Sequence, residues 1–145
     1  MAKTLTSSQL TFVDITDQRK LSAYLTSNLT TIQTLDSGAY SPSWVSSPLV
    51  ITPQVFIDQT ALDLSKVTIL WKRKDGNSAE ADLIDGETVS GNILTVNANN
   101  LGAATSGMIT YICYVSYTDS ETNQTVNITD QMTYTLIKAA ENAKS

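Results

Sequence analysis

The chain has 145 residues, enough for one domain with a packed core but too few for two full domains. Its 41% apolar and 16% charged residues exclude an intrinsically disordered chain, and no apolar run reaches the length of a transmembrane helix. The formal net charge of −5 has the wrong sign for a protein whose main task is to hold nucleic acid or an anionic membrane.

The first 48 residues give mixed signals. Residues 10–16 fit either a strand packed on both faces or an edge strand that another segment covers. Residues 21–25 fit one turn of helix or a second short strand, and residues 31–35 predict a further strand before a turn. Pro42 and Pro48 cannot lie in a central strand, because proline donates no hydrogen bond to a sheet. The best internal boundary therefore falls at residue 48.

From Leu49 onward, apolar and polar residues alternate as in strands with one buried face. Strands are predicted over residues 49–57, 67–74, 80–84, 93–96, 108–117 and 126–137. Pro53 indicates an edge or a bulge in the first of these. Asp75-Gly76 is typical of a two-residue hairpin turn, so we expect the chain to fold straight back through residues 80–84. The polar residues 138–145 are expected to form a frayed tail.

Three residues carry an immunoglobulin-like layout. Trp71 lies on the third predicted core strand, and Tyr111 comes two residues before the single cysteine, Cys113. This spacing predicts a tyrosine corner, in which the Tyr111 hydroxyl bonds back to the backbone of the preceding loop. Val55 or Ile57 stands where a disulfide partner for Cys113 would be, so Cys113 is expected to be a buried small hydrophobe and not a reactive thiol.

These patterns together predict the fold class. We expect an all-β, immunoglobulin-like antiparallel β-sandwich over residues 49–137, with an N-terminal strand and loop extension over residues 1–48 and a C-terminal tail over residues 138–145. A composition of 21 Thr and 16 Ser favours pleated strands in the same way.

Catalytic chemistry has few side chains to use in this sequence. There is no His, so the usual general base for a serine nucleophile is missing, and one cysteine cannot form an intrachain disulfide or a Cys/His zinc cluster. We therefore expect no catalytic, cofactor-binding or metal site.

Two clusters of charged residues each have a structural and a functional interpretation. Glu80, Asp82, Asp85 and Glu87 could supply oxygen ligands for Ca²⁺, but they lack the spacing of a known calcium loop, and a solvated hairpin is the simpler interpretation. The basic run at residues 72–74 could contact phosphate or a cell-wall polyanion, but strand alternation sends Arg73 away from its two lysine neighbours and splits the run. Protection of a sheet edge by lysine is the simpler interpretation.

The aromatic residues of the N-terminal part are the candidate interface. Tyr24, Tyr40 and Trp44 could anchor a partner subunit or stack on sugars, since Tyr and Trp are enriched at interfaces. They could equally plug one end of the sandwich.

Longer strings of the sequence are similar to a known group. The chain resembles immunoglobulin-like domains of structural proteins in tailed bacteriophages, especially tail proteins. The resemblance is carried by Phe12-Val-Asp-Ile-Thr-Asp17, Leu21-Ser-Ala-Tyr-Leu-Thr-Ser-Asn28, Tyr40-Ser-Pro-Ser-Trp44, Pro48-Leu-Val-Ile-Thr-Pro53, Trp71-Lys-Arg-Lys-Asp-Gly76 and the strand from Tyr111 to Tyr117.

The resemblance implies a non-enzymatic virion protein, made in the host cytoplasm without a signal peptide. A small tail-associated subunit of the tail tip, fibre or baseplate is expected, with other virion proteins as partners and possible assembly into a homo-oligomer. The alternatives are a module that binds a carbohydrate or receptor on the host surface, or a capsid decoration protein. Neither nucleic acid nor membrane is an expected partner.

Overall fold

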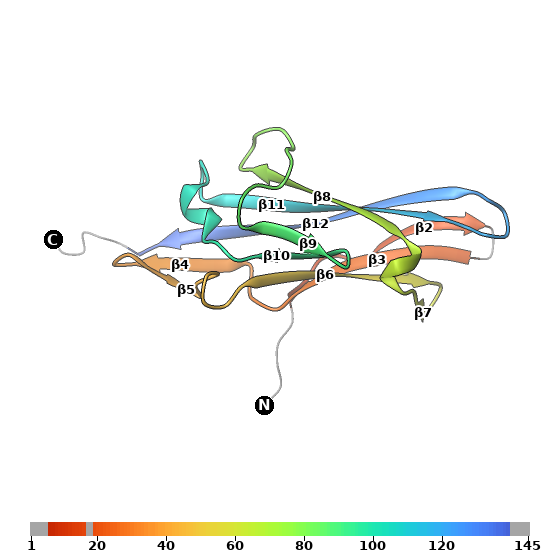
Figure 1. The fold of residues 1–145 in the computed structure, drawn as a ribbon, viewed down its shortest axis with the longest axis horizontal. Helices are drawn as coiled ribbons and strands as arrows, with labels where there is room; N and C mark the ends of the chain where they lie inside the picture. Colours follow the sequence, from red (N-terminus) through yellow and green to blue (C-terminus); the bar gives the residue numbers. More distant parts are fainter. Residues whose placement is uncertain (1–5, 17–18, 140–145) are drawn as a thin grey trace, which may run out of the picture.

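The computed structural model describes residues 6–16 and 19–139, which are built almost entirely of β-strands (Figure 1). In chain order the strands are β1 (Thr6–Ser7), β2 (Thr11–Thr16), β3 (Arg19–Ser27), β4 (Ile32–Asp36), β5 (Ala39–Ser41), β6 (Leu49–Ile57), β7 (Thr60–Ala61), β8 (Thr68–Asp75), β9 (Glu87–Ser90), β10 (Ile93–Val96), β11 (Met108–Thr118) and β12 (Thr125–Lys138). Two short 3-10 helices, η1 (Leu64–Lys66) and η2 (Asn100–Ala103), lie in loops. Neither of these helices, in the part of the chain described, is long and apolar enough to cross a membrane.

The strands form two sheets that enclose one core. The first sheet has the order β1-β3-β6-β10-β9, with β2 also on β3 and β7 also on β6, and the second has the order β5-β4-β12-β11-β8. β4 runs parallel to β12, while the other strand pairs of the two sheets are antiparallel. The order β3-β6-β10-β9 opposite β12-β11-β8 corresponds to strands A-B-E-D opposite G-F-C of an immunoglobulin sandwich. The predicted all-β sandwich is confirmed.

The core follows the predicted alternation closely. Five of the six predicted strands form, as β6, β8, β10, β11 and β12, and their inward residues are buried. They pack with residues of β2, β3 and the loop before β6. Fully or nearly fully buried residues from both parts of the chain include Leu21, Leu25, Trp44, Leu49, Ile51, Leu94, Ile109, Tyr111 and Tyr134. Residues on both sides of position 48 therefore share two sheets and one core.

The N-terminal residues are built into the sandwich as strands. Residues 21–25, which fitted a helix turn or a strand, belong to β3, and β3 pairs with β6 from Leu21 opposite Ile57 to Ser27 opposite Ile51. Strand β2 pairs with the other side of β3 and adds a further strand at that edge. At the other end of the chain, β12 continues to Lys138, and residues 140–145 of the expected tail lie outside the described residues.

The return strand predicted after the Asp75-Gly76 turn does not form. No strand forms over residues 80–84, where the backbone makes one isolated antiparallel bridge, between Arg73 and Ala81. The Asp75 carboxylate instead accepts a hydrogen bond of 2.9 Å from the Thr105 backbone N–H, which ties this turn to a distant loop. The tight hairpin occurs later, at Gly91 and Asn92, whose φ angles of 59° and 67° suit a turn that joins β9 directly to β10.

Pro53 lies where β6 has a neighbour on one side. It pairs with Leu25 of β3, whereas β10 pairs with β6 over residues 49–51 and β7 over residues 56–57. The missing N–H of proline therefore removes no ladder hydrogen bond to β10 or β7. At Pro53 itself, β6 is locally an edge strand, as the sequence predicted.

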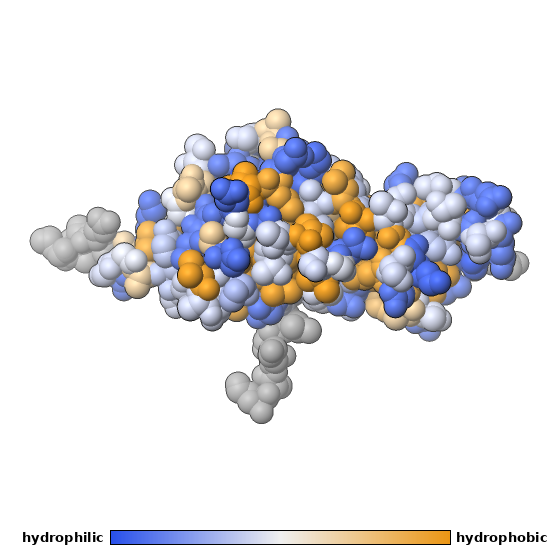
Figure 2. All heavy atoms as spheres, in the orientation of Figure 1, coloured by the Kyte–Doolittle hydropathy of each residue, from blue (hydrophilic) through white to orange (hydrophobic). Residues whose placement is uncertain are grey.

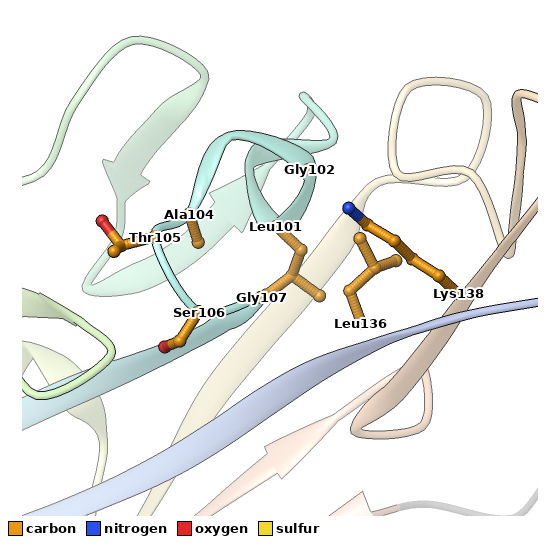
Figure 3. A pocket seen from close by; sticks show the side chains of 8 residues that line it. All are labelled: Leu101, Gly102, Ala104, Thr105, Ser106, Gly107, Leu136 and Lys138. Atoms are coloured by element: carbon orange, nitrogen blue, oxygen red, sulfur yellow. The ribbon is translucent and has the colours of Figure 1, made fainter.

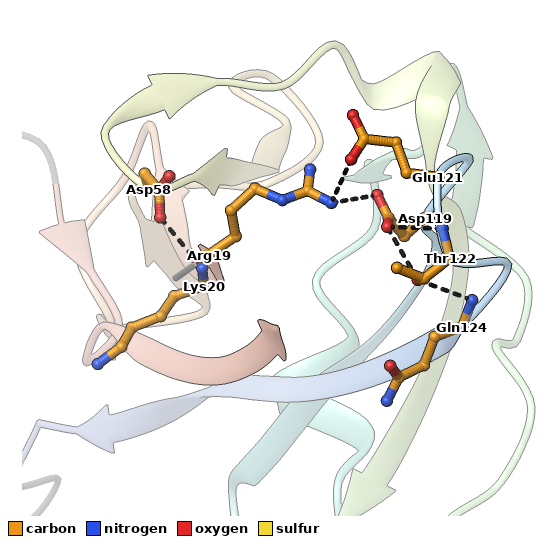
Figure 4. A network of polar contacts seen from close by, with 7 residues as sticks. All are labelled: Arg19, Lys20, Asp58, Asp119, Glu121, Thr122 and Gln124. Carbon is orange, nitrogen blue, oxygen red and sulfur yellow. Dashed lines mark hydrogen bonds and ion pairs between the residues drawn. The ribbon is translucent and has the colours of Figure 1, made fainter. Parts of the chain in front are cut away.

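The loop between β11 and β12 is fastened to the start of β3 (Figure 4). Asp119 is 1% exposed, and its carboxylate lies 2.7 Å from the Arg19 guanidinium. It also accepts hydrogen bonds from the backbone N–H and the hydroxyl of Thr122, at 3.1 and 2.9 Å. The hydrogen bond from Arg19, reinforced by those from Thr122, lowers the pKa of Asp119 below its usual range.

Candidate interaction surfaces

The three signature residues meet in the core. Trp71 pairs with Cys113 across β8 and β11, and Trp71, Cys113 and Tyr111 are 4%, 0% and 0% exposed. The Trp71 indole donates a hydrogen bond of 3.1 Å to the Asn92 backbone carbonyl, so it bridges the two sheets at the β9–β10 turn. Burial, followed by the negative charge of Asp130, raises the pKa of Cys113 to about 12, which makes this thiol a poor nucleophile at neutral pH.

Tyr111 does not form the predicted tyrosine corner. Its hydroxyl donates a hydrogen bond of 2.6 Å to Oε2 of Glu87, a side chain on β9, and not to a loop backbone. The physical reason is that Glu87 points inward from β9 into the space that the Tyr111 ring reaches, and a carboxylate is a stronger acceptor than a carbonyl. Burial and the charge of Glu87 raise the pKa of Tyr111, so the phenol remains a proton donor.

Glu87 is the centre of a buried polar network. Its Oε1 lies 3.0 Å from Arg73 Nε and accepts a hydrogen bond of 2.9 Å from the Ile84 backbone N–H. Its Oε2 accepts hydrogen bonds from Tyr111 and, at 3.0 Å, from the Asn100 amide. The Glu87 side chain is fully buried and that of Arg73 is 9% exposed, so the expectation that Glu87 belongs to a solvated hairpin is wrong.

The network joins two loops and both sheets, and its contacts occupy the Glu87 carboxylate. A carboxylate has about four acceptor positions, and four donors fill them here. We assign the network a structural role. One sequence signal could have revealed it: Arg73 shares the inward parity of Trp71, and an inward arginine requires a buried acceptor.

The other acidic residues of this segment face solvent. Lys72 and Asp82 form an ion pair of 2.7 Å, and the Tyr114 hydroxyl contacts the Glu80 carboxylate at 2.5 and 2.6 Å. The split of the basic run is as expected, since Arg73 is buried while Lys72 reaches an exposed acid. Across residues 6–16 and 19–139, no group of three or more His, Cys, Asp and Glu side chains is placed to hold a metal ion.

The three expected interface aromatics do not form one surface. Trp44 is 1% exposed and packs edge-on against Tyr134, with ring centroids 5.7 Å apart. Its backbone N–H donates a hydrogen bond of 2.7 Å to Asn99, a partner 55 residues away, which holds the loop over the core. Trp44 therefore plugs the sandwich and is not presented to a partner. Tyr40 is half-buried against Gly102, and Tyr24 is half-buried on the outer face of the first sheet.

Tyr24 belongs to an aromatic surface that we define as Phe12, Tyr24 and Phe56. The rings of Tyr24 and Phe56 are nearly parallel, at 11°, with centroids 6.0 Å apart. Phe12 and Phe56 flank Ser22 in the register of β2, β3 and β6, and Ser22 is only 5% exposed beneath them. Phe12 is 60% exposed. This surface lies on the outer face of the first sheet, and neither phenylalanine was an interface candidate from the sequence.

A second surface lies along the side where β8 and β9 end the two sheets. We define the edge surface as Leu70, Ile84 and Val89, which lie on these two strands or on the loop that joins them and are 54%, 47% and 42% exposed. Figure 2 shows apolar side chains gathered along the middle of the molecule in this view, with hydrophilic side chains toward the right-hand end. Strand β9 pairs with β10 on one side, and β8 pairs with β11 on one side.

A hollow of about 330 Å³ lies between η2 and the end of β12 (Figure 3). Its lining includes Leu101 and Leu136 at the base, with Lys138 at the rim pointing toward η2. Lys138 is the only ionisable residue of this lining, so the hollow does not bring an acid and a base together.

Comparison of the chain with protein-family models, curated proteins and solved structures finds no match in any of the three. The chemistry of the two exposed surfaces is therefore the basis for assigning a function.

Proposed function

We propose that this chain is a non-enzymatic structural protein of a bacteriophage virion, a small tail-associated subunit that acts by assembling with other virion proteins. The resemblance of its sequence motifs to immunoglobulin-like domains of phage tail proteins supports the virion setting. The edge surface is the single structural observation that carries the assembly role.

The edge surface suits a protein partner for two reasons. Leu70, Ile84 and Val89 each expose an apolar side chain on the two edge strands or on the loop between them, and exposed apolar residues rimmed by polar ones mark association sites. The outer sides of β8 and β9 also leave backbone N–H and C=O groups outside the strand ladders, apart from the bridge between Arg73 and Ala81. A strand of another protein can pair with such groups, whereas a sugar or small molecule cannot reproduce that pairing.

The proposal is tested by incorporation into particles. In a phage that encodes this chain, we expect the wild-type protein to remain with purified virions and the Val89→Asp variant to be lost from them, because a carboxylate on the edge surface must be desolvated on assembly. The matched control is Val45→Asp, which places the same charge at a residue that is 62% exposed in the loop before β6 and should leave incorporation unchanged.

Antibody labelling of virions in negative stain would show where the chain lies, and sedimentation of the purified chain would show whether copies associate alone. Absence of the wild-type chain from purified particles would refute the virion role. Equal incorporation of Val89→Asp and Val45→Asp, with both variants folded by thermal melting, would refute the edge surface as the assembly contact.

A further inference from the structure

The aromatic surface is separate from the edge surface and from the core. Phe12, Tyr24 and Phe56 come from three neighbouring strands of the first sheet and point to its outer face. The rings of Tyr24 and Phe56 are nearly parallel and half-buried, and the ring of Phe12 is 60% exposed. Ser22 lies beneath them and is 5% exposed. Leaving the Phe12 ring and parts of the other two rings in water is unfavourable, and a partner that packs on them would remove this cost.

The charge of this face distinguishes between possible occupants. The outward residues of β3 after Lys20 and those of β6 carry no formal charge, and they are Ser22, Tyr24, Thr26, Val50, Thr52, Gln54 and Phe56. Lys20 lies at the end of the face, opposite Asp14 in the register of β2 and β3. A chain with 23 charged side chains, 9 basic and 14 acidic, thus leaves this face neutral.

Amide and hydroxyl groups, which can hydrogen-bond to sugar hydroxyls, lie beside the rings. The Gln54 amide donates a hydrogen bond of 3.2 Å to the Thr26 hydroxyl, which itself donates to the Thr52 backbone carbonyl at 3.2 Å. An amide and a hydroxyl have more donor and acceptor positions than these two bonds use. Apolar ring faces beside hydroxyl and amide groups are complementary to a sugar ring, which presents C–H groups on its faces and hydroxyls around its rim.

We infer that the aromatic surface binds an uncharged polysaccharide, with pyranose rings stacked on Tyr24 and Phe56 and Phe12 contacting the same chain. This inference goes beyond the assembly role and does not rest on it, because the two surfaces share no residue.

Other occupants fit less well. A peptide strand would pair with an open backbone edge, but β3 is bonded on both sides beside Tyr24, and β6 is bonded on both sides at Phe56. Among the described residues of this surface, only β2, which carries Phe12, pairs on one side alone. An anionic polymer, such as a nucleic acid, meets a face with Lys20 as its one cation in a chain of net charge −5. A second copy of this chain brings the same net charge of −5, which opposes association.

The experiment is affinity electrophoresis of the full chain in native gels that contain dextran, laminarin, mannan or hydroxyethyl cellulose. We expect retardation by at least one of these four neutral polysaccharides and none by polygalacturonate, which is anionic. Tyr24→Ala and Phe56→Ala should each weaken the retarding interaction about tenfold, the order of loss when an aromatic stacking partner is removed. Tyr24→Phe keeps the ring and should keep the binding.

Three controls make the result decisive. Val45→Ala removes an exposed apolar side chain elsewhere and should bind as the wild type does. Val89→Asp, the assembly variant, should also bind normally, so that a failure of the assembly proposal is distinguishable from a failure of this one. Thermal melting of each variant separates loss of binding from loss of the fold.

Four outcomes would overturn the inference. They are no retardation in any of the four neutral gels, equal binding by Tyr24→Ala and the wild type, stronger retardation by polygalacturonate, and a concentration-dependent dimer in sedimentation that Tyr24→Ala abolishes. The last outcome would assign the aromatic surface to contact between copies.

Discussion

Removing the Glu87 carboxylate should be among the most destabilising single changes in this protein. In Glu87→Ala the Arg73 guanidinium, 9% exposed, stays buried without its counter-charge. The Tyr111 hydroxyl and the Asn100 amide also lose the acceptor that they share. Breaking a buried ion pair by deleting one partner costs about 3–5 kcal/mol, so we expect a loss of that order in the free energy of unfolding.

Equilibrium urea unfolding followed by tryptophan fluorescence measures this loss. Trp44 and Trp71 are 1% and 4% exposed, so both report the transfer of indole rings from the core to water. The matched control is Asp85→Ala, which removes an exposed acid two residues away and should change the free energy of unfolding by less than about 0.5 kcal/mol.

The double variant Arg73→Met with Glu87→Leu should recover most of the stability lost in Glu87→Ala, because it leaves no charge buried alone. A loss below about 1 kcal/mol in Glu87→Ala, or a double variant less stable than Glu87→Ala, would show that the network does not work as an ion pair held away from water.

Three further predictions concern other parts of the fold. The hydrogen bonds that lower the pKa of Asp119 stabilise the folded state above about pH 4, and this stabilisation is lost as the pH falls through the pKa of Asp119 in the folded protein. Asp119→Asn should therefore flatten the acid side of a curve of unfolding free energy against pH. Parallel curves for the variant and the wild type would contradict this. Cys113 should resist iodoacetamide at pH 8 until denaturant unfolds the chain, and rapid labelling of the native protein, followed by mass spectrometry, would contradict its burial. Gly86→Ala should lower the melting temperature more than Gly91→Ala. Both glycines have a positive φ, but only at Gly86 would an added Cβ come close to another side chain, 2.7 Å from the Cβ of Ala98. Equal decreases in melting temperature would mean that backbone strain alone causes the loss.

The sequence was most informative where strands have one buried and one exposed face. The alternation over residues 126–137 correctly placed Val126, Ile128, Met132, Tyr134 and Leu136 in the core, because side-chain direction in a strand is fixed by period two. The approach of Trp71 to Cys113 followed from the same rule together with the spacing of an immunoglobulin layout.

Residues whose environment depends on distant partners were less predictable. The burial of Trp44 depends on Asn99 and Tyr134, and nothing in the Ser- and Pro-rich string around Trp44 indicates that contact. Glu87 lies within an acidic stretch that resembles a surface loop, and only the inward direction of Arg73 marks its place in the core.

The aromatic surface was found in part. Tyr24 was a candidate from its residue type, but its companions Phe12 and Phe56 lie 12 residues before and 32 residues after it in the sequence. The pairing of β2 and β6 on the two sides of β3 brings them together, and period-two patterns do not specify which strands become neighbours.

The parallel pairing of β4 with β12 has a mechanical consequence. It joins a strand near the beginning of the chain to the last strand, from Ile32 opposite Thr135 to Leu35 opposite Lys138. Tension that pulls β4 back toward its amino end and β12 forward toward its carboxyl end acts along both strands, so the bonds between them are loaded in shear and must yield together. In an antiparallel pair pulled apart from one end, the hydrogen bonds would break one after another, at a lower force.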